Sequence, residues 1–133
     1  MTSEKAILIK NWRNQAMTIK VEVNGETLTA RLENNSSAKA FADKLNDGPI
    51  TIHMNDYANF EKVGNLGFKL PTNDKPYTTK AADIILYCGN QLVFYYDTNH
   101  WNFTKLGVFE NIDQVGLKKV FGRRDITAVI SLA

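Results

Sequence analysis

The dipeptide Asn24-Gly25 separates two segments in which apolar and polar residues alternate, and it restricts the fold of this chain more than any other feature. Residues 17–23 alternate strictly before it, and residues 28–32 resume the alternation after it. A period of two is typical of a strand with one buried face. Asn-Gly favours the positive φ angles that both central positions of a type I′ turn require. The sequence therefore predicts an antiparallel β-hairpin over residues 17–32.

The rest of the chain predicts more strands and two short helices. Further strands are expected at residues 50–54, 83–87, 92–96, 101–109 and 126–132. The first helix is expected to start at Ser36 or Ser37 as N-cap, and the second to run from Asp113, as N-cap, to a stop at Gly122. Residues 56–79 are polar and rich in glycine and proline, so they are expected to form a long loop that is either functional or flexible.

These elements belong to one domain. A chain of 133 residues is long enough for one hydrophobic core and too short for two ordinary ones. Residues 1–16 show no clear period, so we expect an N-terminal extension there and a single domain over residues 17–133. Many short strands must bury one face and hide their edges, which predicts a mainly β, antiparallel barrel or sandwich with two short helices.

Charge and hydropathy exclude several classes of function. The 16 basic and 14 acidic side chains are spread along the chain, so no surface for nucleic acid is expected. The apolar runs are far shorter than the roughly 20 residues of a membrane-spanning helix. The first residues lack the apolar core and cleavage site of a signal peptide, so a cytoplasmic protein with no membrane span is expected.

Several segments resemble a bacterial cyclophilin-like family of small proteins that has no assigned activity. The similar segments are residues 37–42, 54–57, 61–66, 69–73 and 82–87. The resemblance covers about residues 17–132 and implies that the strands close into a cyclophilin-like antiparallel β-barrel. It implies little about function, because one fold hosts many functions.

The same resemblance bears on prolyl isomerase activity. Cyclophilins that isomerise prolyl bonds use an arginine on the strand after the first helix, beside an aromatic pocket. Here that strand contains no arginine, and His53 stands near the matching place. A largely neutral imidazole does not replace a permanent bidentate cation. We therefore expect a module that binds a small molecule or an extended peptide without isomerase activity, and the alternative is a weak prolyl isomerase.

The candidate ligand-binding residues combine aromatic, polar and acidic side chains. They are Tyr57, Phe60, Glu61 and Asn65 in the expected loop, with His53 and Trp101. The alternative is structural: Tyr57, Phe60 and Trp101 would cover the barrel end, while His53, Glu61 and Lys62 would stay in solvent.

Metal and thiol chemistry are not expected. His53 and His100 lack partners at metal-ligand spacing, so no metal or other cofactor is predicted. Cys88, the only cysteine, is expected to be a buried free thiol rather than a nucleophile.

Overall fold

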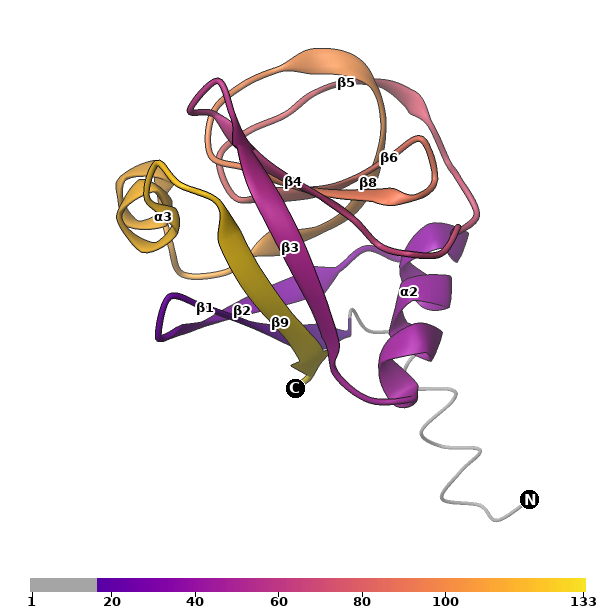
Figure 1. Ribbon diagram of the computed structural model, residues 1–133. Coiled ribbons are helices and arrows are strands. Elements are labelled where there is room, and N and C mark those ends of the chain that lie inside the picture. Colours follow the sequence, from indigo (N-terminus) through magenta and orange to yellow (C-terminus); the bar gives the residue numbers. More distant parts are fainter. Residues whose placement is uncertain (1–16) are drawn as a thin grey trace, which may run out of the picture.

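The computed structural model describes residues 17–133, so the extension expected at residues 1–16 lies outside the described part of the chain (Figure 1). Strands dominate this part. In chain order the elements are β1 (Thr18–Val23), β2 (Glu26–Leu32), α2 (Ser36–Asn46), β3 (Ile50–Tyr57), β4 (Glu61–Asn65), β5 (Lys75–Thr78), β6 (Asp83–Tyr87), β7 (Gln91–Tyr95), β8 (His100–Phe109), α3 (Gln114–Phe121) and β9 (Ile126–Leu132).

Eight of the strands close into a barrel. Neighbouring strands pair in the order β2-β1-β9-β3-β4-β7-β6-β8, and β8 pairs with β2 from Ala30↔Phe109 to Leu32↔Gly107. Every pairing is antiparallel, and β5 adds to the first part of β8 outside the ring. Closure leaves no free edge on the ring strands. The closed antiparallel barrel with two helices is therefore confirmed.

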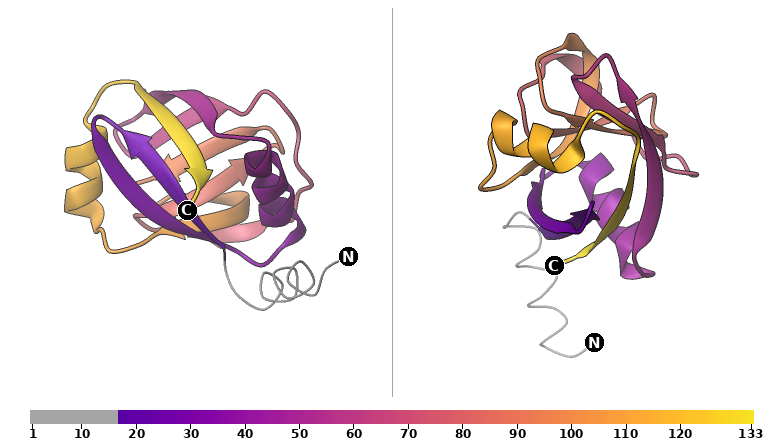
Figure 2. Two further views of the ribbon diagram at one scale, coloured as in Figure 1. Left: turned by 90° about the horizontal axis from the view of Figure 1, so that it is seen from below. Right: turned by 60° about the vertical axis from the view of Figure 1, so that its left-hand side comes forward.

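Helices α2 and α3 lie at opposite ends of the barrel (Figures 1 and 2). Phe41 on α2 and Phe121 on α3 are both fully buried and belong to the same hydrophobic core. The ring of Phe121 contacts the ring of Phe94 on β7 at 5.8 Å between centroids. Each helix thus closes one end of the barrel by placing its apolar face on the shared core.

The helix ends match the sequence at one N-cap and differ at the other. Asp113 caps α3 as expected, since its carboxylate accepts a hydrogen bond from the Gly116 amide at 2.8 Å. The N-cap of α2 is Asn35, whose side-chain oxygen accepts from the Ala38 amide at 2.8 Å, so the prediction of Ser36 or Ser37 is wrong by one or two residues. Asparagine is as favourable an N-cap as serine.

In its turns and loops, the structure confirms one sequence prediction and corrects two. Asn24 and Gly25 have φ angles of 51° and 78°, and the predicted β1–β2 hairpin is confirmed. The loop expected over residues 56–79 is wrong, because it contains β4 and β5, and β4 joins β3 through a second tight turn. The buried position expected for Cys88 is also wrong. This residue lies in the β6–β7 turn with a φ of 55°, and its side chain is exposed.

Strands β6 and β7 are buried on both faces, as their weak alternation predicts. Their inward residues join the main core of the barrel. Their outward residues Ile85, Val93 and Tyr95 pack with Phe103 of β8 in a second, smaller cluster. This outer cluster forms the base of the candidate site.

Candidate ligand-binding pocket on the outer face of the barrel

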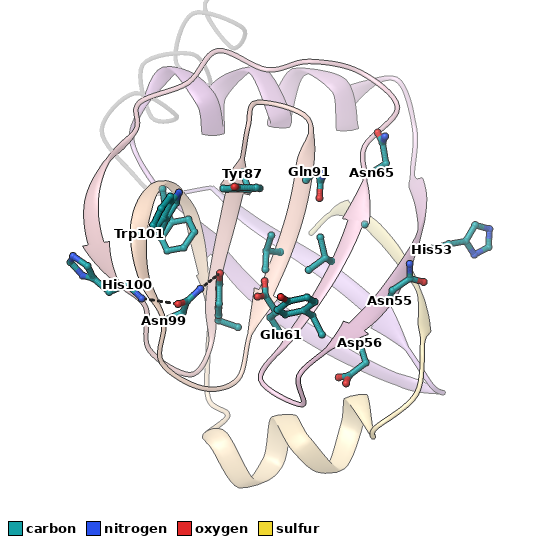
Figure 3. Close-up of a pocket in the computed structure, with 16 residues that line it drawn as sticks. His53, Asn55, Asp56, Glu61, Asn65, Tyr87, Gln91, Asn99, His100 and Trp101 are labelled. Atoms are coloured by element: carbon teal, nitrogen blue, oxygen red, sulfur yellow. Dashed lines mark hydrogen bonds between the residues drawn. The ribbon is translucent and has the colours of Figure 1, made fainter.

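A cavity of about 760 Å³ opens on the outer face of β3, β4, β6 and β7, and the first part of β8 lies at its side (Figure 3). Side chains from five strands and from the segment before β8 line it. They are His53, Asn55, Asp56, Tyr57, Glu61, Val63, Gly64, Asn65, Tyr87, Gln91, Val93, Tyr95, Asn99, His100, Trp101 and Phe103.

Cross-strand pairing arranges most of these side chains in three rows across the sheet. The rows are Tyr57–Glu61–Tyr95, Asn55–Val63–Val93 and Asn65–Gln91–Tyr87. Residues directly opposite one another on antiparallel strands project to the same face. The first row therefore places a carboxyl group between two phenol rings. The second gives an apolar base of two valines with the Asn55 amide at its edge, and the third adds two more amide groups at the far side.

Aromatic rings form a continuous wall around this base. The ring of Phe60 contacts those of Tyr57 and Tyr95 at 5.8 and 6.3 Å between centroids. Phe103 continues the wall, with centroid distances of 5.7 Å to Tyr95 and 6.2 Å to Tyr87. We call these five residues the aromatic wall. Such surfaces suit the flat face of a ligand ring.

Glu61 is the acidic group within the first row. Glu61 is the first residue of β4 and is only 7% exposed to solvent. Burial raises the pKa of its carboxyl to about 7, the negative charge of Asp56 adds to the increase, and the hydrogen bond with Tyr95 opposes it. Within residues 17–133, no lysine, arginine or histidine lies at ion-pair distance from Glu61.

Tyr95 hydrogen-bonds Glu61, and a chain of further hydrogen bonds links Tyr95 to the start of β8. The Asn99 side-chain amide donates to the Tyr95 hydroxyl at 3.2 Å, and its oxygen accepts from the His100 amide at 3.0 Å (Figure 3). The backbone amide of Asn99 donates to the Thr79 hydroxyl at 2.8 Å. Burial and the nearby Glu61 raise the pKa of Tyr95 above its usual range, although the bond with Asn99 opposes them, so this hydroxyl stays protonated. These contacts fix the segment that carries Trp101.

Lys62, the next residue on β4, points to the opposite face and is fully buried. Its ammonium donates to Asp56 Oδ1 at 2.9 Å and to the carbonyl oxygens of Gly122 and Arg124 at 2.8 and 2.7 Å. The Tyr96 hydroxyl also donates to Asp56. Burial raises the pKa of Asp56, but the hydrogen bonds from Tyr96 and Lys62 outweigh it and leave the pKa below its usual range.

The structure places five of the six sequence candidates at the cavity. They are His53, Tyr57, Glu61, Asn65 and Trp101. The side chain of His53 points away from the cavity and hydrogen-bonds Thr127 at 3.0 Å (Figure 3). Phe60 is not a lining residue but belongs to the aromatic wall. The role of all six in binding stays a prediction.

The structural alternative fails for several of these residues. Tyr57 and Trp101 are 62% and 61% exposed, so neither closes a barrel end. Glu61 and Lys62 are buried rather than solvated. His53 is exposed on the polar face of β3, as that alternative expects.

Sequence reasoning missed several lining residues, among them Tyr87, Tyr95, Asn99 and Phe103. Their separation from residues 57–65 along the chain hides their proximity. The one available signal is alternation along 83–96: once the inward residues are chosen, Tyr87 and Tyr95 must project outward.

Within residues 17–133 no group of three or more His, Cys, Asp or Glu side chains is arranged to hold a metal ion. In the same part of the chain, no helix has the length and apolar character needed to cross a membrane.

The closed barrel with end-capping helices and an outer-face pocket defines a class of fold, and comparison with known proteins gives the family. Residues 21–131 match the model of the cyclophilin-like family. The match covers most of the chain, so the chain belongs to the cyclophilin-like family. No curated protein matches the sequence.

Two solved structures share the fold at low sequence identity. A hypothetical protein, AF2241 from Archaeoglobus fulgidus, is 13% identical with a TM-score of 0.65, and the match covers 89% of this chain and 95% of that protein. McbB, solved in complex with tryptophan, is 16% identical with a TM-score of 0.60 over 86% of this chain. The match spans 44% of the McbB chain, so the present domain corresponds to less than half of that protein.

Proposed function

We propose that this domain binds a small molecule with an aromatic group in the outer-face pocket and does not isomerise prolyl bonds. The observation that carries the proposal is a cavity of about 760 Å³ with an apolar base, aromatic sides and amide groups at its margin. Ligand sites commonly have volumes of about 300–1,000 Å³ and combine apolar surface with a few polar groups. The similarity to McbB, which was solved with tryptophan, agrees with an aromatic ligand.

The composition of the pocket argues against prolyl isomerase chemistry. Among the described residues that line the cavity there is no arginine or lysine. Arg31 projects from β2, is exposed and pairs with Glu110 at 3.8 Å, so it does not supply the missing cation. The charge held beneath the aromatic surface is instead a carboxyl group. When ionised, such a group repels negative charge that develops on a carbonyl oxygen, and it does not supply the permanent cation of a prolyl isomerase.

The binding proposal is tested by NMR titration with tryptophol, a neutral indole alcohol, and with tryptophan. Amide shifts should concentrate on β4, β7 and the start of β8 and leave β1 and β2 unchanged. Val63→Phe fills the base of the pocket and should weaken binding by about tenfold or more, since a well-packed site tolerates added volume poorly.

Val129→Phe is the matched control. Both valines are half-buried on the outward face of a strand, but Val129 lies on β9 outside the cavity lining. Equal affinity in the two variants, or shifts spread over β1 and β2, would reject the pocket as the binding site.

A protease-coupled assay with a Xaa-Pro peptide tests the second half of the proposal. We expect the rate of cis/trans isomerisation to equal the uncatalysed rate at every protein concentration. An increase proportional to protein concentration that Val63→Phe abolishes would support the isomerase alternative instead.

A further inference from the structure

The buried carboxyl of Glu61 has no cationic partner in the described part of the chain, and this sets it apart from the other buried charges. Lys62 is paired with Asp56, and buried Asp83 is paired with Lys105 at 3.6 Å. Buried charged groups are normally paired because removal from water is costly. The absence of a cationic partner for Glu61 within residues 17–133 therefore points to a cation from outside this part of the chain.

We propose that the pocket selects ligands that carry a protonated amine beside their aromatic group, with Glu61 as the counter-ion of that ammonium. This inference rests on the proposed binding function and names the charge of the ligand. The first row provides the geometry: Glu61 lies between Tyr57 and Tyr95, and all three line the cavity.

The aromatic wall supports the same choice. A ring face carries partial negative charge and attracts cations, most strongly where water is excluded. The wall around Glu61 therefore favours an ammonium group and disfavours a carboxylate. Among the described lining residues, the side chains that can carry positive charge are His53 and His100, and both are exposed.

The amide groups of the margin suit the remainder of such a ligand. Asn55, Asn65 and Gln91 line the cavity on the side of β3, β4 and β7. Each amide offers both a donor and an acceptor and carries no charge. They can bind polar substituents of the ligand without competing for Glu61.

Proton balance gives the binding a measurable signature. Near neutral pH part of the protein carries a protonated Glu61, because burial raises its pKa to about 7. When an ammonium ligand binds, the carboxyl must release this proton to the buffer. A neutral ligand of the same shape requires no proton release. The affinity for an amine should thus rise as the pH approaches 8, where an alkylamine is still protonated, while the affinity for an alcohol should not.

Other titratable groups lie near Glu61 and must be separated from it. They are Asp56 and Tyr57 on β3, Tyr87 on β6, Tyr95 on β7 and Tyr96 directly after it, His100 at the start of β8 and His53 at the margin. Two of these groups, His53 and His100, are histidines and are removed together in a control variant. The double variant His53→Gln/His100→Gln should keep the pH dependence of amine binding if Glu61 is its source.

Calorimetry with three indole probes of matched shape tests the proposal: tryptamine carries an ammonium, tryptophol a hydroxyl and indole-3-propionate a carboxylate. We expect tryptamine to bind about tenfold or more tightly than tryptophol, as a desolvated ion pair with cation–π support allows. Indole-3-propionate should bind most weakly. In Glu61→Gln the advantage of tryptamine and its proton release should disappear, while tryptophol binding changes little.

Glu22→Gln on β1 removes the same charge at an exposed site and serves as the control, and it should bind all three probes as the parent protein does. Equal binding of tryptamine and tryptophol to the parent protein would overturn the ammonium proposal and leave the binding function standing. Binding of none of the probes would overturn both. Should Glu61→Gln fold poorly, the probe series and its pH dependence in the parent protein decide the matter alone.

Discussion

Lys62 and Glu61 are neighbours on β4, and both are buried, but the barrel surrounds their charges in opposite ways. Lys62 points inward, where a carboxylate and two carbonyl oxygens accept hydrogen bonds from its ammonium. Glu61 points outward into a cavity, and its carboxyl hydrogen-bonds the phenol of Tyr95. The inward charge is neutralised within the fold, whereas no cation within residues 17–133 neutralises the outward one.

This difference separates a structural role from a functional one. A buried ion with all its partners in place holds elements together, and here Lys62 ties β3, through Asp56, to the carbonyls between α3 and β9. A buried acid without a cation lowers stability when it ionises and is retained where binding or chemistry uses it. The predictions below test whether the two faces of β4 divide in this way.

The largest effect is expected for Lys62→Met. The substitution leaves Asp56 and two carbonyl oxygens without their cation, and breaking a buried pair costs about 3–5 kcal/mol of unfolding free energy. Urea denaturation measures the loss, with Lys20→Met on the exposed face of β1 as control. The double variant Lys62→Met/Asp56→Asn should recover part of the stability. A loss no greater than that of the control would mean that Lys62 does not hold the barrel end.

Glu61→Gln, in contrast, should increase the free energy of unfolding at neutral and higher pH. The folded-state pKa of Glu61 is raised to about 7 from an ordinary value of 4.5. Stability from the neutral carboxyl is therefore complete below the unfolded-state pKa, is lost as the pH rises from 4.5 to 7, and is absent above that range. Each tenfold change in proton affinity is worth about 1.4 kcal/mol, so ionisation removes about 3 kcal/mol.

Urea denaturation of the parent protein and Glu61→Gln between pH 5 and pH 8 checks this prediction. The difference between the two proteins cancels the contributions of the histidines and of Asp56. Glu61→Gln should be the more stable protein by about 3 kcal/mol at pH 8 and by no more than about 1 kcal/mol at pH 5. A difference that stays constant across the range would show that Glu61 is not the titrating group.

The contrast between these neighbours also explains where sequence reasoning succeeds. The β1–β2 hairpin and both helices follow from local signals such as Asn24-Gly25 and Asp113, which act within a few residues. Strand β4 was missed because it begins with Glu61-Lys62, and paired charges indicate solvent unless their partners are known. Those partners are distant in sequence: Lys62 contacts carbonyls about 60 residues away. Most of the residues that line the candidate site were not among the sequence candidates, and those on β6 and β7 were missed for the same reason.

Gly64→Ala should disturb the close approach of β3 and β4. A Cβ at this position would lie 2.6 Å from the His53 carbonyl oxygen and 2.6 Å from a methyl carbon of Ile52, both too close without a shift of the strand. Such overpacking costs about 1–3 kcal/mol. Thr27→Ala on the exposed face of β2 should stay within about 0.5 kcal/mol of the parent in the same denaturation experiment. Equal stability of the two variants would mean that β3 and β4 can separate freely.

Trp101→Ala should have the smallest effect on stability and a clear effect on binding. Trp101 is 61% exposed at the margin of the cavity, so its removal should change the unfolding free energy by no more than about 0.5 kcal/mol. Loss of its ring should weaken tryptophol binding several-fold, because the ring supplies apolar contact area to the ligand. Val115→Ala on α3, where the valine is 74% exposed outside the cavity lining, should change neither quantity. Unaltered tryptophol affinity in Trp101→Ala would remove this residue from the site, whereas a stability loss well beyond that of Val115→Ala would return it to a structural role. Together the two variants distinguish an exposed aromatic ring that contacts the ligand from an exposed apolar side chain that does not.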